Sequence, residues 1–293
     1  MFAKANKEKS KLRLAIFGVS GSGKTKSALR IATGISSQIN KRIALIDSER
    51  GTASKYSDEF DFDTAILESK KVDSYIKTIQ EASKAGYEIL IIDSASHAWD
   101  SILEEVEIVA QASFKGNTWS AWSKLTPKYN KFIEAIIDYP GHIIITMRSK
   151  TEWDRNEKNQ PIRVGTSPKS GKDIEYEFDM LMSLSSNHIG EIIKDRSGKF
   201  QDKIIENPNE DLGIELINWL SVGVEKPKVK IDYLQKLKDS LPELDLDRIQ
   251  RKTIPSWNEL IESDKITPDE FSEGETLIWR RVGELEKSNP NRI

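Results

Sequence analysis

The chain has 293 residues, and its 44 Lys and Arg against 47 Asp and Glu leave a formal net charge of −3. It contains no cysteine, which excludes disulfides, thiolate metal sites, iron–sulfur clusters and cysteine nucleophiles. The three histidines are too scattered for a His-rich zinc site, and we expect each to be structural or exposed. No apolar run approaches the roughly 20 residues that cross a bilayer, and the N-terminus shows no signal-peptide core. We therefore expect a soluble cytoplasmic protein with no membrane partner, whose chemistry rests on Lys, Arg, Asp, Glu, Ser and Thr.

Short apolar runs alternate with helical periodicity from residue 12 to about residue 184, which is typical of an α/β fold with a mostly parallel sheet covered by helices. The predicted strands are 12–18, 42–47, 88–93, 142–147 and 178–184. Helical faces are predicted for Val72, Ile76, Ile79 and Ala82, for Ile102, Val106, Val109 and Ala110, and for Tyr129, Phe132, Ile133, Ile136 and Ile137. Trp119 and Trp122 lie three residues apart, and we expect one helix face to bury both in the core.

Residues 151–175 are polar, contain Gly and Pro, and lack periodicity. They predict a long loop, which inside a compact domain is usually functional or disordered. After it, residues 178–184 and 189–195 predict a hairpin, and residues 210–220 predict the helix that closes the domain.

The chain is predicted to contain a main domain over residues 1–222, a linker over 223–230 and a small acidic helical domain over 231–293. In the last of these, Thr267, Pro268 and Glu270 supply the N-cap, first-turn proline and capping-box partner of a final helix.

The strongest motif is GVSGSGKT, which matches the phosphate-binding loop (P-loop) pattern GxxxxGK[ST] and stands between an apolar strand and a helical pattern. Gly18, Gly21 and Gly23 allow backbone conformations in which successive N–H groups converge on a phosphate at a helix N-terminus. Lys24 then reaches the β- and γ-phosphate oxygens, and the Thr25 hydroxyl binds Mg²⁺. The predicted ATP-binding residues are Gly18, Ser20, Gly21, Ser22, Gly23, Lys24, Thr25, Lys26, Thr146 and Arg148.

Two carboxylates complete the predicted catalytic site. Asp93 ends a buried strand, where a P-loop protein places the acid that joins Thr25 at Mg²⁺. The next residue is Ser94 and not Glu, so the base that activates water has to come from elsewhere. Glu49 follows the strand after the P-loop helix, and it is predicted to be that base provided its strand lies beside the P-loop strand. A surface carboxylate that merely ends a strand is the alternative.

The order of these motifs resembles the RecA/Rad51 class of P-loop ATPases, in which the base occupies the Glu49 position. The sequence looks closest to phage-encoded RecA-core ATPases, often encoded near single-strand-annealing and single-stranded-DNA-binding proteins. The segments that carry this resemblance, over about residues 12–220, are GVSGSGKT, IDSE, IIDSASHAWD, TMRSKTEWD, DIEYEFDMLMSL and KDRSGKF. The resemblance implies a RecA-like fold and Mg²⁺-dependent ATP hydrolysis, and it leaves the small C-terminal domain outside.

The resemblance also implies roles for four further residues. ITMRSK stands where RecA proteins have a strand that ends in Asn-Gln and senses the γ-phosphate, so Thr146 or Arg148 would do the sensing here. Lys194 and Arg196 occupy the place of paired lysines that reach the ATP of the neighbouring subunit. They would then stabilise the charge on the transferring phosphoryl group in trans, and ATP would lie at a subunit interface of a ring or filament. Ordinary charges at a hairpin end are the alternative.

The 151–175 segment corresponds to the DNA-binding loop of RecA proteins, although its residues do not match theirs. Its cations are able to follow a phosphate backbone, and Trp153 is able to stack on a base. The predicted nucleic-acid contacts are Lys150, Arg155, Lys158, Arg163, Lys169 and Lys172. A solvated loop of mixed charge is the alternative, because acidic residues dilute the field.

The sequence thus predicts a Mg²⁺-dependent ATPase that acts on single-stranded DNA in phage recombination or replication, in the host cytoplasm. A single-stranded-DNA-binding or annealing protein is a further expected partner. A nucleotide-gated adaptor or helicase loader is the alternative function. It would bind a helicase or another replication protein, such as a single-stranded-DNA-binding protein, through residues 231–293, with little DNA contact. A small-molecule kinase also uses a P-loop, but no lid of clustered arginines is visible.

Overall fold

The computed structural model describes residues 10–112, 116–155, 161–171, 174–223, 233–262 and 266–288, with side chains for all of these except 153–155 and 161–164. The chain divides into two compact units, residues 1–225 and 226–293. Within the described residues, every helix is too short or too polar to span a bilayer.

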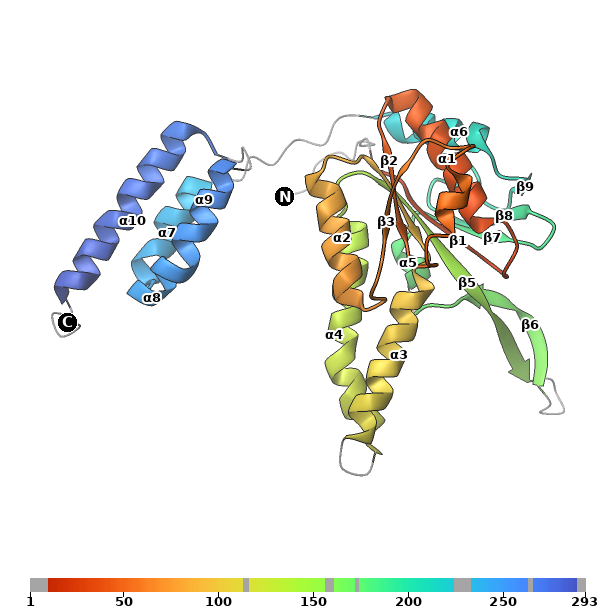
Figure 1. The fold of residues 1–293 in the computed structure, drawn as a ribbon, viewed down its shortest axis with the longest axis horizontal. Coiled ribbons are helices and arrows are strands. Elements are labelled where there is room, and N and C mark those ends of the chain that lie inside the picture. The colour runs from red at the N-terminus through yellow and green to blue at the C-terminus, as the bar shows by residue number, and fades with distance from the viewer. Residues whose placement is uncertain are drawn as a thin grey trace. The chain divides into compact units, whose positions relative to one another are not determined.

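The first unit is built on one sheet, shown in Figure 1. Its strands run in the order β3 (Asp63–Ile66), β2 (Ile43–Asp47), β4 (Ile89–Asp93), β5 (His142–Arg155), β1 (Arg13–Gly18), β7 (Met180–Leu184), β8 (Ile189–Asp195) and β9 (Ile204–Glu206). The strands from β3 to β7 pair in parallel, and β8 and β9 pair antiparallel at one edge. The remaining strand, β6 (Pro161–Pro168), pairs antiparallel with the outer half of β5.

Helices cover both faces of this sheet (Figure 1). One face packs against α2 (Val72–Lys84), α3 (Ser96–Gln111) and α4 (Thr118–Ile137), and the other against α1 (Lys24–Ile39) and α6 (Glu210–Ser221). Alternate residues of β1 enter the two cores, since Ala15 and Phe17 face the first layer while Leu14 and Ile16 face the second. Two short helices, η1 (Ala53–Tyr56) and α5 (Ile174–Glu177), complete the unit. The predicted α/β class, with a mostly parallel sheet covered by helices, is confirmed.

The largest correction concerns residues 151–175, which were predicted to form a long loop. β5 continues through Arg155, and β6 returns beside it, so most of the segment is a hairpin that extends beyond the sheet (Figure 1). Lys150, Thr151 and Glu152 are exposed on this extension. The sequence shows no alternation there because these strand residues have no buried face, and the strands are held by backbone pairing.

Three smaller features also differ from the prediction. The edge strands β3 and β9 were not predicted, since all four β3 residues are exposed and β9 has only three residues. Trp122 packs against the core and stacks on Trp99, with ring centroids 5.7 Å apart. Trp119, predicted to be buried beside it, is 83% exposed in the first turn of α4, so the expected pair of core tryptophans is wrong for one of them.

The second unit consists of α7 (Tyr233–Ser240), η3 (Leu241–Glu243), α8 (Leu246–Arg248), η4 (Ile249–Thr253), α9 (Ile254–Glu262) and α10 (Pro268–Ser288). Its own core contains Leu237, Leu241, Ile249, Trp257, Ile266, Ile278 and Val282. The predicted capping box opens α10: the N–H of Thr267 donates to Glu270 Oε2 at 2.7 Å, and the N–H of Glu270 donates to Thr267 Oγ1 at 3.2 Å. The predicted linker, except for Gly223, lies outside the described residues.

Candidate nucleotide-binding site

A cavity of about 960 Å³ opens at the carboxyl end of the parallel strands, between the start of α1 and the ends of β2, β4 and β5. Eight of the ten predicted ATP-binding residues line it. The other two, Ser22 and Thr146, are fully buried behind its wall. The structure therefore brings the predicted P-loop residues together with Glu49, Asp93 and Arg148 around one hollow.

The P-loop has the winding that its glycines predict. Gly21 and Gly23 have φ values of 79° and 86°, in the left-handed region that glycine adopts at little cost. A Cβ at Gly18 would lie 2.3 Å from the carbonyl oxygen of Leu184, so no side chain fits there. Gly23 is the N-cap of α1, and the first N–H groups of a helix lack intrahelical acceptors, which makes this turn an anion-binding position.

Lys24 and Thr25 begin α1 and face the cavity. The Lys24 ammonium donates to the carbonyl oxygen of Val19 at 2.8 Å, inside its own loop. Burial lowers the pKa of Lys24, while Asp93 and Glu49 raise it by their charge. A phosphate would offer this ammonium a charged partner in place of a neutral carbonyl, and charge-assisted hydrogen bonds are the stronger kind.

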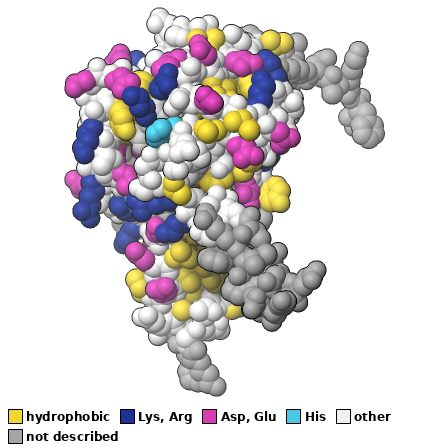
Figure 2. All heavy atoms as spheres, turned by 90° about the vertical axis from the view of Figure 1, so that its right-hand side faces the viewer, with side chains coloured by type: hydrophobic (Ala, Val, Ile, Leu, Met, Phe, Trp, Pro, Cys, Tyr) yellow, Lys and Arg dark blue, Asp and Glu magenta, His cyan; other side chains and the backbone are white. Residues whose placement is uncertain are grey.

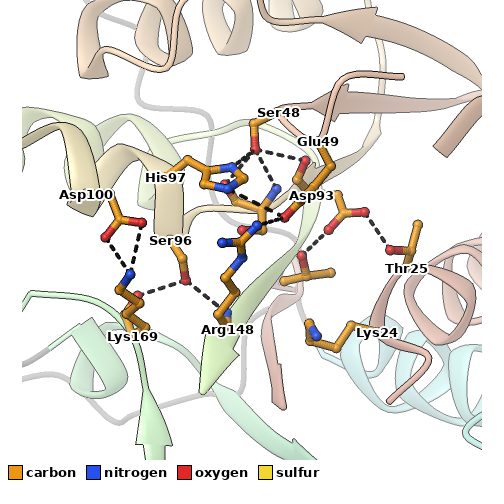
Figure 3. A network of polar contacts seen from close by, with 12 residues as sticks. Lys24, Thr25, Ser48, Glu49, Asp93, Ser96, His97, Asp100, Arg148 and Lys169 are labelled. Carbon is orange, nitrogen blue, oxygen red and sulfur yellow. Dashed lines mark hydrogen bonds and ion pairs between the residues drawn. The ribbon is translucent and has the colours of Figure 1, made fainter. Parts of the chain in front are cut away.

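Asp93 ends β4 and is 3% exposed. The Thr25 hydroxyl donates to its Oδ2 at 2.6 Å, and the Thr146 hydroxyl donates to its Oδ1 from β5 (Figure 3). Burial raises the pKa of Asp93 even though both hydroxyls favour the charged form. A cation beside this carboxylate would offset the desolvation of its charge.

The donor set around Thr25 and Asp93 suits Mg²⁺. Within the described residues, no group of three or more His, Cys, Asp or Glu side chains is arranged to hold a metal ion. A cation here would therefore be bound by the Thr25 hydroxyl, with Asp93 beside it, and otherwise by water and phosphate oxygens. Mg²⁺ is the metal that keeps waters and substrate phosphates as ligands in this way.

Glu49 was predicted to be the base on the condition that its strand lies beside the P-loop strand. That condition is wrong, but the Glu49 carboxylate still reaches the cavity. β4 and β5 lie between β2 and the P-loop strand β1, so the Glu49 strand is not beside the P-loop strand. Glu49 lies two residues beyond β2, where the Asp47 carboxylate accepts the N–H of Glu49 at 2.6 Å and the N–H of Ala53 at 2.9 Å. This turn directs the Glu49 side chain into the cavity, opposite Lys24 (Figure 3).

Arg148 is the residue of β5 that aligns with Gly18 of the P-loop strand. Its Nη2 lies 2.8 Å from Glu49 Oε1, and its side chain is 45% exposed at the cavity wall. Thr146, the other candidate for sensing the γ-phosphate, holds Asp93 from behind and does not line the cavity. Of the two residues, only Arg148 is placed to contact a bound nucleotide directly.

Comparison with known proteins agrees with this geometry. The family described as "AAA domain" matches residues 10–204, well over half of the chain. The chain belongs to the AAA domain family. The coarse assignment of a P-loop ATPase follows from this membership together with the loop geometry.

A crystal structure of a KaiC-like protein, PH0186, from the hyperthermophilic archaeon Pyrococcus horikoshii OT3 is also similar. It is 16% identical with a TM-score of 0.39, and the match covers 73% of this chain and 88% of that chain. No curated protein matches the chain.

Residues that were not predicted from the sequence also line the cavity of the AAA domain. His188, in the turn between β7 and β8, lies at the cavity wall with its Nδ1 3.0 Å from the carbonyl oxygen of Ser22. β7 is the parallel neighbour of β1, so its end meets the P-loop, and this follows only from strand order. Tyr56, Asn207 and Pro208 line the cavity as well, from η1 and from the segment after β9.

Lys194 and Arg196 lie far from the P-loop of their own AAA domain. β8 runs antiparallel to β7, and Lys194 pairs with Leu181 near the start of β7, at the sheet edge opposite Gly18. Lys194 Nζ donates to the carbonyl oxygen of Glu175 at 2.5 Å, and Arg196 donates to that of Tyr176. This placement rules out action on the cavity of the same chain.

The predicted DNA-binding cations are placed unevenly. Lys150 is exposed on β5, and Lys169, just after β6, lies 2.8 Å from Asp100 of α3. Arg155 and Arg163 belong to β5 and β6, but their side chains lie outside the described part, as do Lys158 and Lys172 altogether. On the face drawn in Figure 2, Lys and Arg gather along one side with Asp and Glu among them.

Proposed function

We propose that this AAA-domain protein is a Mg²⁺-dependent ATPase that acts on single-stranded DNA in phage recombination or replication, with ATP bound between subunits. One observation carries the proposal: Arg148 at the nucleotide cavity and Lys150 on the projecting hairpin belong to the same unbroken strand, β5. A strand that is rigid in the sheet transmits a shift of the hairpin to the cavity wall.

The residues of the chain divide the work of hydrolysis. The P-loop N–H groups and Lys24 bind the β- and γ-phosphates, and Arg148 contacts the γ-phosphate. Glu49 accepts a proton from the attacking water, at the carboxylate that faces the cavity. Thr25 and Asp93 would hold Mg²⁺, which would neutralise part of the phosphate charge.

The subunit interface is proposed because one chain leaves the triphosphate short of positive charge. Among the described residues that line the cavity, Lys26 and Arg30 are each paired with a glutamate of their own. Lys24 and Arg148 are the other Lys and Arg side chains among these lining residues, and Arg148 forms an ion pair with Glu49. Lys194 and Arg196 of a neighbouring subunit are the cations proposed to complete the site, in a ring or a filament.

Single-stranded DNA is the proposed effector because the hairpin presents a solvated, strand-like surface with Lys150 exposed. Contacts to phosphates alone are largely independent of sequence. Binding to the hairpin is expected to stimulate ATP hydrolysis through β5. A single-stranded-DNA-binding or annealing protein is the proposed protein partner on the same DNA.

The test is ATPase activity titrated with single-stranded DNA at two protein concentrations. Wild type is expected to be stimulated by DNA, and Glu49→Gln is expected to lose about 100- to 10,000-fold in turnover because the base is removed. Lys150→Glu is expected to need roughly tenfold more DNA for the same stimulation. Lys131→Glu, an exposed lysine of α4, is the matched control.

Two results would contradict the proposal. Turnover that is equal with and without DNA, and independent of protein concentration, would remove both the DNA effector and the shared site. Wild-type turnover in Glu49→Gln would remove Glu49 from the role of base.

A second candidate function is a nucleotide-gated adaptor or helicase loader. It is favoured by the separate core of the second unit and by Trp279 on α10, which is 54% exposed. An exposed tryptophan is a common anchor in protein interfaces. An adaptor would need little DNA contact, so its ATPase would respond little to DNA, and Trp279→Ala would abolish binding of its partner protein. The first proposal expects DNA-stimulated ATPase that Trp279→Ala leaves unchanged.

A further inference from the structure

The Glu49 carboxylate has two basic neighbours in the described part of the chain. Its Oε1 lies 2.8 Å from Arg148 Nη2 and 3.6 Å from His97 Nε2. Figure 3 draws the three side chains together. His97 comes from the first turn of α3 and is not a wall residue of the nucleotide cavity. His97 therefore faces the same carboxylate oxygen as Arg148, from a different element.

Arg148 is a poor permanent partner for a catalytic base. Its side chain is 45% exposed and lies at the wall of the cavity that would hold the triphosphate. A guanidinium binds phosphate oxygens by charge-assisted hydrogen bonds, so a γ-phosphate competes with Glu49 for it. Once Arg148 turns to the phosphate, Glu49 needs another group to keep its direction.

His97 has the opposite character, because its ring is buried and hydrogen-bonded through Nδ1. It is 6% exposed, and its Nδ1 lies 2.8 Å from Ser48 Oγ. Ser48 is itself buried and accepts the N–H of Ser94 at 2.9 Å. Ser48 precedes Glu49 directly, so the ring is hydrogen-bonded to the backbone segment that carries the carboxylate.

The surroundings of the ring favour one tautomer. The Glu49 carboxylate 3.6 Å from Nε2 favours a proton on that nitrogen. Nδ1 then accepts from the Ser48 hydroxyl, whose other acceptors within reach are the carbonyl oxygens of Ser94 at 3.1 Å and Asp93 at 3.2 Å. Burial lowers the pKa of His97 and favours this neutral form. The charge of Glu49 raises this pKa, and the charges of Lys70 and Arg148 lower it. A shift of a few tenths of an ångström would bring the Nε2–H to hydrogen-bond distance from Oε1.

From this geometry we propose that His97 is a positioning residue for the catalytic base: it holds one oxygen of Glu49 when Arg148 moves to the γ-phosphate, and it leaves the other oxygen to the attacking water. The inference rests on the proposed ATPase activity and on Glu49 as its base. It assigns His97 no contact with the substrate, so its loss is expected to affect turnover and not nucleotide binding.

The test compares kcat, KM and equilibrium binding of a fluorescent ATP analogue in the full-length protein. His97→Ala is expected to lower kcat by about 10- to 100-fold, with KM and affinity within about twofold of wild type, because only the direction of Glu49 is lost. His97→Gln is expected to recover most of the turnover, since its amide both donates to Glu49 and accepts from Ser48. Glu104→Gln, on the same helix, is the matched control.

A double-mutant cycle separates positioning from general damage. In a Glu49→Gln background, adding His97→Ala is expected to change turnover by less than about twofold, because there is no base left to position. The proposal would be overturned if the two single-variant losses of turnover multiplied in the double variant, or if His97→Ala lost nucleotide affinity. An inactive Glu49→Gln with an active His97→Ala would refute this inference alone, whereas an active Glu49→Gln would refute the proposed base itself.

If His97→Ala does not fold, as judged by thermal unfolding, Ser48→Ala provides the second variant. It leaves the ring in place but removes the hydroxyl that is hydrogen-bonded to Nδ1. It is expected to lower kcat in the same direction by a smaller factor, with affinity unchanged. Full wild-type kcat in Ser48→Ala would overturn the proposal in that case, because the ring would not need to be held to direct Glu49.

Discussion

Charged side chains lie at both ends of the parallel strands, here called the carboxyl edge and the amino edge of the sheet. The hydrogen bonds of these side chains have different partners at the two edges. At the carboxyl edge, Lys24, Glu49 and Arg148 face an open cavity and contact one another or a single carbonyl. At the amino edge, the Arg13 guanidinium donates to the carbonyl oxygens of Leu12, Ile137, Tyr139 and Gly141. His142, also at that edge, accepts the N–H of Leu12 at 3.1 Å.

This difference in hydrogen-bond partners distinguishes charged residues that stabilise the fold from charged residues that bind a ligand. Charges whose hydrogen bonds are filled by backbone groups hold the chain together, because leaving those carbonyls unpaired would be costly. Charges that face a cavity with spare hydrogen-bonding capacity are available to a ligand. Lys194 and Arg196 are an exception to this distinction. They lie at the amino edge and donate to backbone carbonyl oxygens, yet the proposed function requires them to act on the ATP of a neighbouring subunit.

The largest expected effect tests that exception. Arg196→Ala is expected to lower turnover by roughly 1000-fold, the size of an arginine finger's contribution, with the fold intact. Because the finger and the P-loop would come from different subunits, mixing Arg196→Ala with Lys24→Ala is expected to restore activity that neither variant has alone. The measurement is ATPase activity over a range of mixing ratios. Inactivity at every ratio would return Arg196 to a structural role.

Lys24 represents the carboxyl edge on its own. Lys24→Ala is expected to lower turnover by about 100- to 1000-fold and to weaken binding of the ATP analogue, because the ammonium that faces the phosphates is lost. The unfolding free energy should change little, since the side chain has one hydrogen bond, to Val19. Lys41→Ala, a surface lysine paired with Glu88, is the control for loss of a positive charge. Equal activity in the two variants would break the distinction between the edges.

Arg13 represents the amino edge. Arg13→Ala is expected to lower the free energy of unfolding by roughly 2 to 4 kcal/mol, because several carbonyls at the end of α4 lose their donor. Turnover of the folded fraction should stay near wild type. Arg42→Ala, which breaks an exposed pair with Asp63, should cost less than about 1 kcal/mol. Denaturant unfolding of the three proteins decides the point.

His142 gives the amino edge a pH dependence. Burial lowers its pKa to about 4, whereas in the unfolded chain the group titrates near 6.5. Between these values the unfolded chain binds the proton and the folded protein does not, so the free energy of unfolding falls as the pH is lowered, by up to about 3 kcal/mol. His142→Gln keeps an acceptor for the N–H of Leu12 and should flatten this slope. An unchanged slope would assign the acid sensitivity to other groups.

The part of the site formed by neighbouring residues was predicted from the sequence. The parts that the fold brings together from distant segments were predicted only in part. GVSGSGKT specifies its own turn because the glycines and the helix start are neighbours along the chain. Glu49 was selected because it follows the strand after the P-loop helix, and the resemblance agreed. The condition attached to it, that its strand lies beside the P-loop strand, was wrong because β4 and β5 intervene. His188 was expected to be structural or exposed, and it is exposed; that strand order also brings it to the P-loop was not predicted.

The hairpin shows a second limit. Strands predicted from alternation need one buried face, and the exposed residues of β5 beyond the sheet have none. Their pairing with β6 depends on backbone hydrogen bonds between segments whose side chains carry no such pattern. Trp119 fails for a related reason: helical spacing identifies a face but does not show whether a neighbouring element covers it.

By itself, the sequence determined the phosphate-binding turn, the buried strands and the capping box of α10, because each depends on residues that are close along the chain. Tertiary structure decided which strand ends meet, that Thr25 and Thr146 share Asp93, and that His97 and Arg148 share Glu49. The physical reason is that strand order sets which side chains share an edge, and that order results from the packing of two helical layers onto the sheet, which no short motif encodes.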